Sequence, residues 1–241
     1  MLTNTLFGTR PVVAHSPGFH HNPLHWAALL DAFFSTPRRF LGGRAELTVL
    51  TCNNGSEGMG LLERSLAHLG VPCTVVGRGL ERWANSRHKP TTLLAGLCAA
   101  ETEYVLYADS RDAIVLDDPA IALERFLERF DCDLLFGADR LNWPPLEQFR
   151  RFEDGVSASR GSDFRYLNGG AWIGRTRFAR ELFLEAAGHL PAAEAPDSEQ
   201  GVLKSLFQRH YPRVQLDYRC EVVQNVSLVF TPIFALDEVA R

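Results

Sequence analysis

The sequence predicts an α/β fold in which a mostly parallel central sheet is covered by helices on both faces. From Ala45 onward, short apolar runs alternate with helix-like segments, and this order is typical of parallel strands that are joined by helices. Hydrophobic residues make up 46% of the chain and aromatic residues 10%, which is enough for a sizeable core. Because the chain has 241 residues, we expect one domain over residues 1–241.

Composition argues against several classes of protein. The 25 Lys and Arg residues nearly balance the 29 Asp and Glu residues, for a net charge of −4, so we expect no nucleic-acid partner. No apolar run approaches the roughly 18 residues that span a bilayer, and residues 1–8 lack the features of a secretory signal. Five cysteines without a CxxC pair predict reduced core residues. We therefore expect a cytoplasmic enzyme with no membrane span.

Local signals place the elements of the first half of the chain. An Asp cap and Pro119 open one helix, Gly70 ends another, and Pro90 is expected in the first turn of a third. The runs AELTVLTC, VPCTVVG, EYVLYAD and DLLFGAD are short and apolar, as buried strands are. The predicted strands are residues 45–52, 71–77, 103–109 and 133–139, and the predicted helices are residues 61–69, 89–101 and 117–130.

After Asp139 the regular alternation fades. Residues 142–164 are polar and contain two adjacent prolines, and we predict an irregular acceptor-binding or lid loop there. Beyond it we expect a glycine turn at 167–170, a strand at 171–174, helices near 178–187 and 198–209, and a strand near 220–226.

In an open parallel sheet, ligands bind beyond the carboxyl ends of the strands. The third predicted strand ends in YADSRD, with Asp109 and Asp112 three residues apart. Such paired carboxylates suit a hard divalent cation with oxygen ligands, although an Asp-rich loop with a helix cap also fits. The first strand lacks GxGxxG and GxxxxGK[ST], and no GxSxG is present, so neither a dinucleotide fold, a P-loop nor a serine hydrolase is supported.

Two further clusters stand at expected ligand positions. Asn168 precedes Gly169 and Gly170, where a substrate can approach the backbone closely, or where the chain simply turns. Asp197 and Glu199 open a predicted helix, and acidic residues are common at helix starts for structural reasons alone.

Taken in order, six stretches resemble the glycosyltransferase domain of the procollagen lysyl hydroxylases. They are LTVLTCNNGSEGM, LYADSRDAIVL, LLFGADRLNWP, FRYLNGGAWIG, DSEQGVLKSLF and LDYRCEVVQNV, and they cover most of residues 45–226. Each stretch is unspecific alone, but the ordered set is fairly specific. The resemblance implies the GT-A fold, a UDP-sugar donor, and a manganese or magnesium ion held by the DxxD of Asp109 and Asp112.

The resemblance also implies roles for other residues. Asp197 and Glu199 match an acidic cluster beside the reacting centre, ahead of Gln200, and the choice between these two carboxylates stays open. Asn168 and Gly170 match the turn beside the sugar. The residues that match nucleotide-binding or nearby positions are Thr51, Asn53, Lys89, Ser110, Asp139 and Trp143.

One expected metal ligand is out of place. The family takes a third ligand from a histidine near the C-terminal end of the domain, whereas here no histidine follows His210. Residues 4–18, NTLFGTRPVVAHSPG, resemble that C-terminal stretch, and residues 235–241 resemble the stretch before it. We therefore expect a circular permutation in which residues 1–22 supply His15 as the third ligand, with His20 or His21 near the phosphates. The alternative is an edge strand followed by a solvated histidine.

These implications define the expected activity. The chain is expected to transfer glucose or galactose from a UDP-sugar to a hydroxyl acceptor, which is a protein side chain, a glycan or a small molecule. Two alternatives stay open: an inactive nucleotide-sugar-binding domain, and a sugar nucleotidyltransferase. The nucleotidyltransferases usually carry a basic glycine-rich loop after the first strand, and NNGSEGMG has no basic residue.

Overall fold

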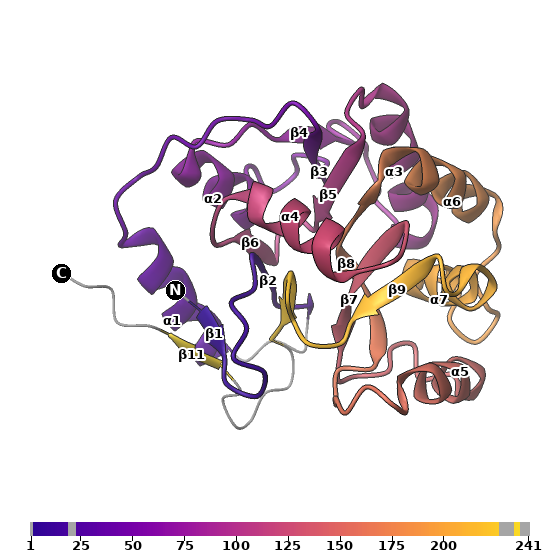
Figure 1. Cartoon of the computed structure of the whole chain (residues 1–241). Helices are drawn as coiled ribbons and strands as arrows, with labels where there is room; N and C mark the ends of the chain where they lie inside the picture. The colour runs from indigo at the N-terminus through magenta and orange to yellow at the C-terminus, as the bar shows by residue number, and fades with distance from the viewer. Residues whose placement is uncertain (1, 19–22, 227–233, 237–241) are drawn as a thin grey trace.

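The computed structural model describes residues 2–18, 23–226 and 234–236. Its largest sheet has six strands in the order β4-β3-β5-β8-β7-β9 (Figure 1). These strands are β3 (Leu47–Cys52), β4 (Thr74–Val76), β5 (Tyr104–Ala108), β7 (Leu134–Asp139), β8 (Tyr166–Arg175) and β9 (Val214–Asp217). β8 runs antiparallel to both of its neighbours, and the other pairs are parallel. The predicted α/β fold with a mostly parallel sheet is confirmed.

Helices cover both faces of this sheet (Figure 1). On β5, Tyr104 packs against Phe126, whereas Tyr107 stacks on Trp172, which stacks in turn on Phe183 of the opposite face. This alternation follows from the two-residue period of a strand. One face carries α2 (Leu61–Leu69) and α4 (Pro119–Arg129), and the other carries α3 (Asn85–Ala99), α6 (Thr176–Gly188) and α7 (Glu199–His210).

Two predicted boundaries are wrong. The glycines at 169 and 170 do not form a turn before a strand, because β8 begins at Tyr166 and runs through them. The register against β7 shifts between Phe136 and Gly137, so the glycines sit in an irregular part of the ladder. α3 begins at Asn85, and Pro90 therefore lies inside the helix instead of in its first turn.

The segment predicted as an irregular loop contains a helix, α5 (Glu147–Ser157). Its inner side carries Phe149, Glu153 and Ser157, which are spaced by four residues and buried. The ε-ammonium of Lys204 in α7 pairs with Glu153, with 2.6 Å between Nζ and Oε2. Because the charged residue Glu153 interrupts the apolar face of α5, the sequence does not show a helical pattern there. The prediction of a loop over residues 142–164 is therefore wrong for residues 147–157.

A second sheet of three strands brings distant parts of the chain together. β2 (Val13–His15) lies between β10 (Val223–Asn225), to which it is parallel, and β6 (Ala113–Val115), to which it is antiparallel. Near it, β1 (Leu2–Asn4) pairs antiparallel with β11 (Phe234–Leu236), as Figure 1 shows. The remaining helix is α1 (Pro23–Phe34). Within the described ranges, no helix has the length and apolar character needed to cross a membrane.

All five cysteines are free. Cys220 is buried, and Cys52, Cys73 and Cys132 are partly buried. Cys98 is exposed on α3, so the prediction that the cysteines are core residues is wrong at this position.

Candidate metal and nucleotide site

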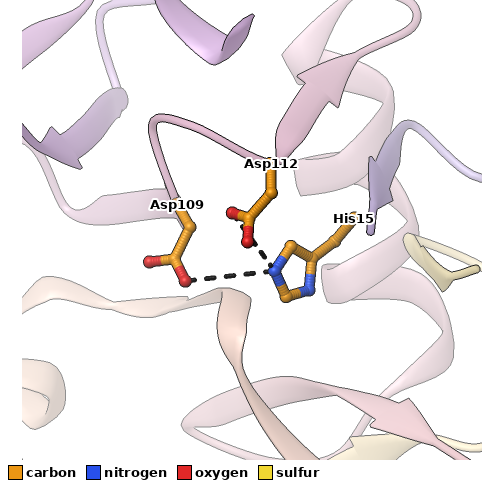
Figure 2. Close-up of side chains that lie close together, drawn as sticks. All are labelled: His15, Asp109 and Asp112. Carbon is orange, nitrogen blue, oxygen red and sulfur yellow. Dashed lines mark ion pairs between the residues drawn. The ribbon is translucent and has the colours of Figure 1, made fainter. Parts of the chain in front are cut away.

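Three potential metal ligands converge from separate elements (Figure 2). His15 ends β2, Asp109 directly follows β5, and Asp112 directly precedes β6. Their ligand atoms all lie within 4.8 Å of one another. His15 Nε2 is 3.9 Å from Asp109 Oδ2 and 3.6 Å from Asp112 Oδ1. The two carboxylates therefore face one imidazole nitrogen across a space that a cation can bridge.

The His15 side chain faces this space with a nitrogen that has no hydrogen-bond partner. The side chain is only 2% exposed, and its Nδ1 lies 2.8 Å from Asn225 Oδ1. Nε2 is buried and has no hydrogen-bond partner, which is costly for a polar atom unless another partner fills the role. Two carboxylate oxygens and one imidazole nitrogen form a donor set that suits Mn²⁺. The residues present thus fit a divalent metal ion.

Backbone contacts hold the three ligands in place. Gly170 O accepts a 2.8 Å hydrogen bond from Asp109 N, which joins the end of β5 to β8. Gly18 N donates to Asp112 Oδ2 at 3.1 Å. A Cβ atom at Gly170 would overlap the His15 ring, so glycine at this position leaves the space that the imidazole occupies.

Opposite charges stabilise the site when no metal is present. Burial alone lowers the pKa of His15, but the carboxylates of Asp112 and Asp109 raise it to about 9. Burial likewise raises the pKa of Asp112, yet His15 lowers it to about 2. The metal-free site is therefore an imidazolium between two carboxylates, and a metal ion can replace the proton.

A buried lysine links the metal site to a third carboxylate. Lys89 Nζ lies 2.8 Å from Asp109 Oδ1 and 2.9 Å from Glu199 Oε1. Burial lowers the pKa of Lys89, but these two carboxylates raise it above its ordinary value. Tyr107 donates its hydroxyl hydrogen to Asp109 Oδ1. Asp109 and Glu199 are thus brought together by one positive charge.

A cavity of about 190 Å³ opens beside the carboxylates. Its wall combines charged groups, amides and aromatic rings, as ligand sites for polar molecules do. Burial raises the pKa of the Cys52 thiol to about 12, so this wall residue is no nucleophile at neutral pH. The lining residues are Cys52, Asn53, Asn54, Trp83, Asn85, Lys89, Tyr107, Asp109, Ser110, Arg111 and Asp112.

Comparison with known proteins places the chain in a family. The family described as the PLOD GT domain matches residues 43–234, which is most of the chain. The chain belongs to the PLOD glycosyltransferase domain family. No curated protein matches it. The predicted resemblance to this family is therefore confirmed.

The match to the PLOD glycosyltransferase domain includes most of the predicted site residues, but His15 lies before it. The structure nevertheless brings His15 to Asp109 and Asp112. His20 and His21, which were expected near the phosphates, lie outside the described residues.

Glu63 holds two residues of the cavity wall in this PLOD glycosyltransferase domain, and the sequence analysis did not identify it. Its carboxylate accepts hydrogen bonds from Asn53 Nδ2 and from Ser110 Oγ, the latter at 2.8 Å. Burial raises the pKa of Glu63, but these hydrogen bonds lower it overall. Thr51 does not line the cavity, because its hydroxyl donates to Ala108 O at 2.7 Å between β3 and β5.

Asp139 and Asn168 form a buried pair behind the glycines. Asn168 Nδ2 donates to Asp139 Oδ2 at 3.0 Å, and Asn168 Oδ1 accepts from Gly170 N at 2.9 Å. This pair holds the irregular part of β8 that contacts His15. Neither Asp139 nor Asn168 lines the cavity beside the carboxylates.

The two acidic candidates at α7 differ in placement. Glu199 is buried against Lys89, and a Cβ atom at Gly169 would lie 3.1 Å from its Oε1. Asp197 is exposed and precedes Ser198, the residue that caps the helix. The structure therefore brings Glu199 to the site and leaves Asp197 at the surface.

Trp143 lies at the edge of this region and is 51% exposed. Its carbonyl accepts a 2.6 Å hydrogen bond from Gln200 Nε2, while Gln200 Oε1 accepts from Gly169 N at 3.0 Å. Gln200 thus connects the segment between β7 and α5, which contains Trp143, to Gly169 of β8. Trp83, which lines the cavity, was missed by sequence reasoning, although it lies between β4 and α3, where the carboxyl end of a parallel strand predicts ligand contacts.

Proposed function

We propose that this protein is a metal-dependent glycosyltransferase that transfers a hexose, glucose or galactose, from a UDP-sugar to a hydroxyl acceptor. Membership in a glycosyltransferase family supports the reaction class. The observation that carries the proposal is the convergence of His15 with Asp109 and Asp112, which line the cavity, together with a buried His15 nitrogen that has no hydrogen-bond partner.

Asp109, Asp112 and His15 would hold Mn²⁺ or Mg²⁺. The ion supplies neutralising charge for a diphosphate leaving group. The chain itself supplies the rest of the binding site: Asn53 and Ser110, held by Glu63, present polar groups to the cavity. Trp83 adds an aromatic face against which a planar base can pack.

Transfer also needs groups at the sugar and at the acceptor. Asn168 fixes the backbone of Gly170, and we assign it the role of orienting the sugar through this irregular part of β8. We assign to Glu199 the role of meeting the acceptor hydroxyl, because it pairs with Lys89 next to Asp109, whereas Asp197 lies at the surface. If the reaction inverts configuration, Glu199 acts as the general base. If configuration is retained, the leaving phosphate can accept that proton.

The third ligand in this proposal comes from the N-terminal segment. We propose that residues 1–22 replace the C-terminal segment of a family domain, as a circular permutation would. Two features support this: β2 is inserted between β6 and β10, and β1 pairs with β11. The acceptor is a protein side chain, a glycan or a small molecule, bound near the exposed ring of Trp143.

The test is UDP release from a panel of UDP-sugars with manganese, with magnesium and with chelator. We expect release from one sugar that requires the metal. His15→Ala and Asp112→Asn should each reduce this release at least about 100-fold, since the first removes a ligand and the second removes the negative charge of a ligand. His189→Ala, a histidine away from the cavity, is the matched control and should retain full release.

Other outcomes contradict parts of the proposal. Metal-dependent release that survives His15→Ala removes His15 from the metal site. UDP binding without release from any sugar in the panel identifies a binding domain instead of a transferase. Absence of both binding and release overturns the proposed donor.

A further inference from the structure

The amide of Asn225 contacts the far side of the proposed metal ligand His15. We infer that Asn225 is a positioning residue that holds His15 in the one tautomer able to bind a metal through Nε2. This inference rests on the proposed metal site and adds a residue that binds neither the metal nor a substrate.

The backbone places the two side chains opposite each other. β2 and β10 are parallel neighbours, and Asn225 is the register partner of His15. The ladder continues past them, because Val226 N donates to His15 O at 2.9 Å. Asn225 is 1% exposed, so bulk water cannot replace its side chain at the imidazole.

The orientation of the Asn225 amide is decided by a third residue. Its Nδ2 donates to the backbone carbonyl of Ala138 at 2.7 Å. A carbonyl oxygen only accepts hydrogen bonds, so the amide nitrogen must face Ala138 and the amide oxygen must face His15. With Oδ1 at 2.8 Å, His15 Nδ1 must then be the donor. The proton of the neutral ring is therefore on Nδ1, and the lone pair is on Nε2.

This assignment matches the geometry of the ligand cluster. Nε2 is the nitrogen that faces Asp109 and Asp112 (Figure 2). With the opposite tautomer, a hydrogen on Nε2 would point at the cation, and two lone pairs would oppose each other between Nδ1 and Oδ1. Partners that fix the free nitrogen of a ligating histidine typically change metal affinity about 10–100-fold.

Gly137, which has no side chain, leaves space for the amide of Asn225. A Cβ atom at Gly137 would lie 3.1 Å from Asn225 Nδ2 and 2.8 Å from Val223 Cγ1. Gly137 stands where the register between β7 and β8 shifts. The same irregular part of the β7–β8 ladder that brings Gly170 against the His15 ring therefore also borders Asn225.

Three variants distinguish a role of Asn225 in positioning His15 from a role in packing. Asn225→Asp keeps an oxygen toward Nδ1 but loses the donor to Ala138, and Asn225→Leu loses both. We expect Asn225→Leu to weaken Mn²⁺ binding about 10–100-fold and Asn225→Asp to stay within about threefold of wild type, measured by calorimetry at pH above neutral. Val223→Ala, a packing loss on the same strand, should leave the affinity unchanged.

A second readout needs no variant. Nitrogen-15 NMR of the imidazole in the Mg²⁺-loaded protein should find the hydrogen of His15 on Nδ1 and none on Nε2. A hydrogen on Nε2 overturns the inference, and so does an Asn225→Asp protein that loses as much affinity as Asn225→Leu. If wild type binds metal and Asn225→Leu binds it equally, Asn225 has no positioning role. If wild type binds neither ion, the proposed function fails instead.

Discussion

His15 carries a proton in the metal-free site at neutral pH, because Asp112 and Asp109 raise its pKa to about 9 although burial opposes this. A cation must displace that proton. We therefore expect Mn²⁺ affinity to rise about tenfold per pH unit from neutrality up to about pH 9 and to level off above it. Calorimetry in matched buffers measures this. His15→Gln should bind weakly with no such slope, and a flat wild-type profile would contradict the proton exchange.

Gly170 is a second residue whose identity has a direct test. Because a Cβ atom there would overlap the His15 ring, Gly170→Ala should lower the free energy of unfolding by about 1–3 kcal/mol and weaken Mn²⁺ binding. Gly155 in α5 has open space around it, so Gly155→Ala should stabilise the protein by about 0.5–1 kcal/mol. Denaturant titrations and calorimetry measure both effects, and equal behaviour of the two variants would be inconsistent with this packing.

Single residues also show how far sequence reasoning reaches. Asp109 and Asp112 were predicted from the sequence because they follow a short apolar run that clearly indicates a strand. The structure brings the two residues to one site. Glu63 and Asn225 were missed, since each contacts a predicted site residue that is distant in the chain: Glu63 contacts Ser110, 47 residues away, and Asn225 contacts His15, 210 residues away. No local spacing signals a contact of that kind, whereas a strand end signals a ligand directly.

At the scale of elements, α5 is held by a buried ion pair. Lys204 pairs with Glu153 at 2.6 Å, both side chains are almost fully buried, and Leu167 N also donates to Glu153. Removing the ammonium leaves a buried carboxylate without its cation. Lys204→Met should therefore lower the free energy of unfolding by about 3–5 kcal/mol.

Urea titration of Lys204→Met tests the role of this ion pair, with two further variants. Lys204→Met combined with Glu153→Leu should recover part of the loss, because no unpaired charge remains. Arg151→Met breaks the exposed pair with Glu147 and should cost less than about 1 kcal/mol. If breaking the buried pair and breaking the exposed pair lower the free energy of unfolding by similar amounts, the Lys204–Glu153 pair does not hold α5 in place.

Elements differed in how well the sequence predicted them. α4 was placed within about two residues at each end, because its Asp118 cap and Pro119 mark the start and its apolar face is uninterrupted. α5 was missed because Glu153 occupies its inner face, and β8 was cut short because glycines inside a strand suggest a turn. In both cases tertiary contacts outweigh local propensity.

At the scale of the whole molecule, the pairing of β1 with β11 makes a reconnected chain feasible. Leu2 is the partner of Leu236 in an antiparallel pair, so a peptide linker between the two chain ends would connect neighbouring strands. A chain linked there and reopened between Pro37 and Arg38, which are both exposed, should fold and bind Mn²⁺ within about threefold of the original affinity.

Circular dichroism and calorimetry measure the fold and the affinity of the reconnected chain. A second version, reopened inside α4 after Leu123, interrupts a helix that packs on the sheet and should not fold. If both versions unfold, the N-terminal segment is not interchangeable with a C-terminal one, and the proposed permutation is wrong.

The order of β2 and β10 along the chain has a consequence for synthesis. His15 and Asn225 are 210 residues apart, and translation at about 5–20 residues per second separates their appearance by on the order of 10–40 s. During that interval β2 lacks its parallel neighbour, and His15 lacks the amide that orients it. The proposed metal site can thus be completed only after β10 has been made, and metal uptake by nascent chains would report that β10 has been made.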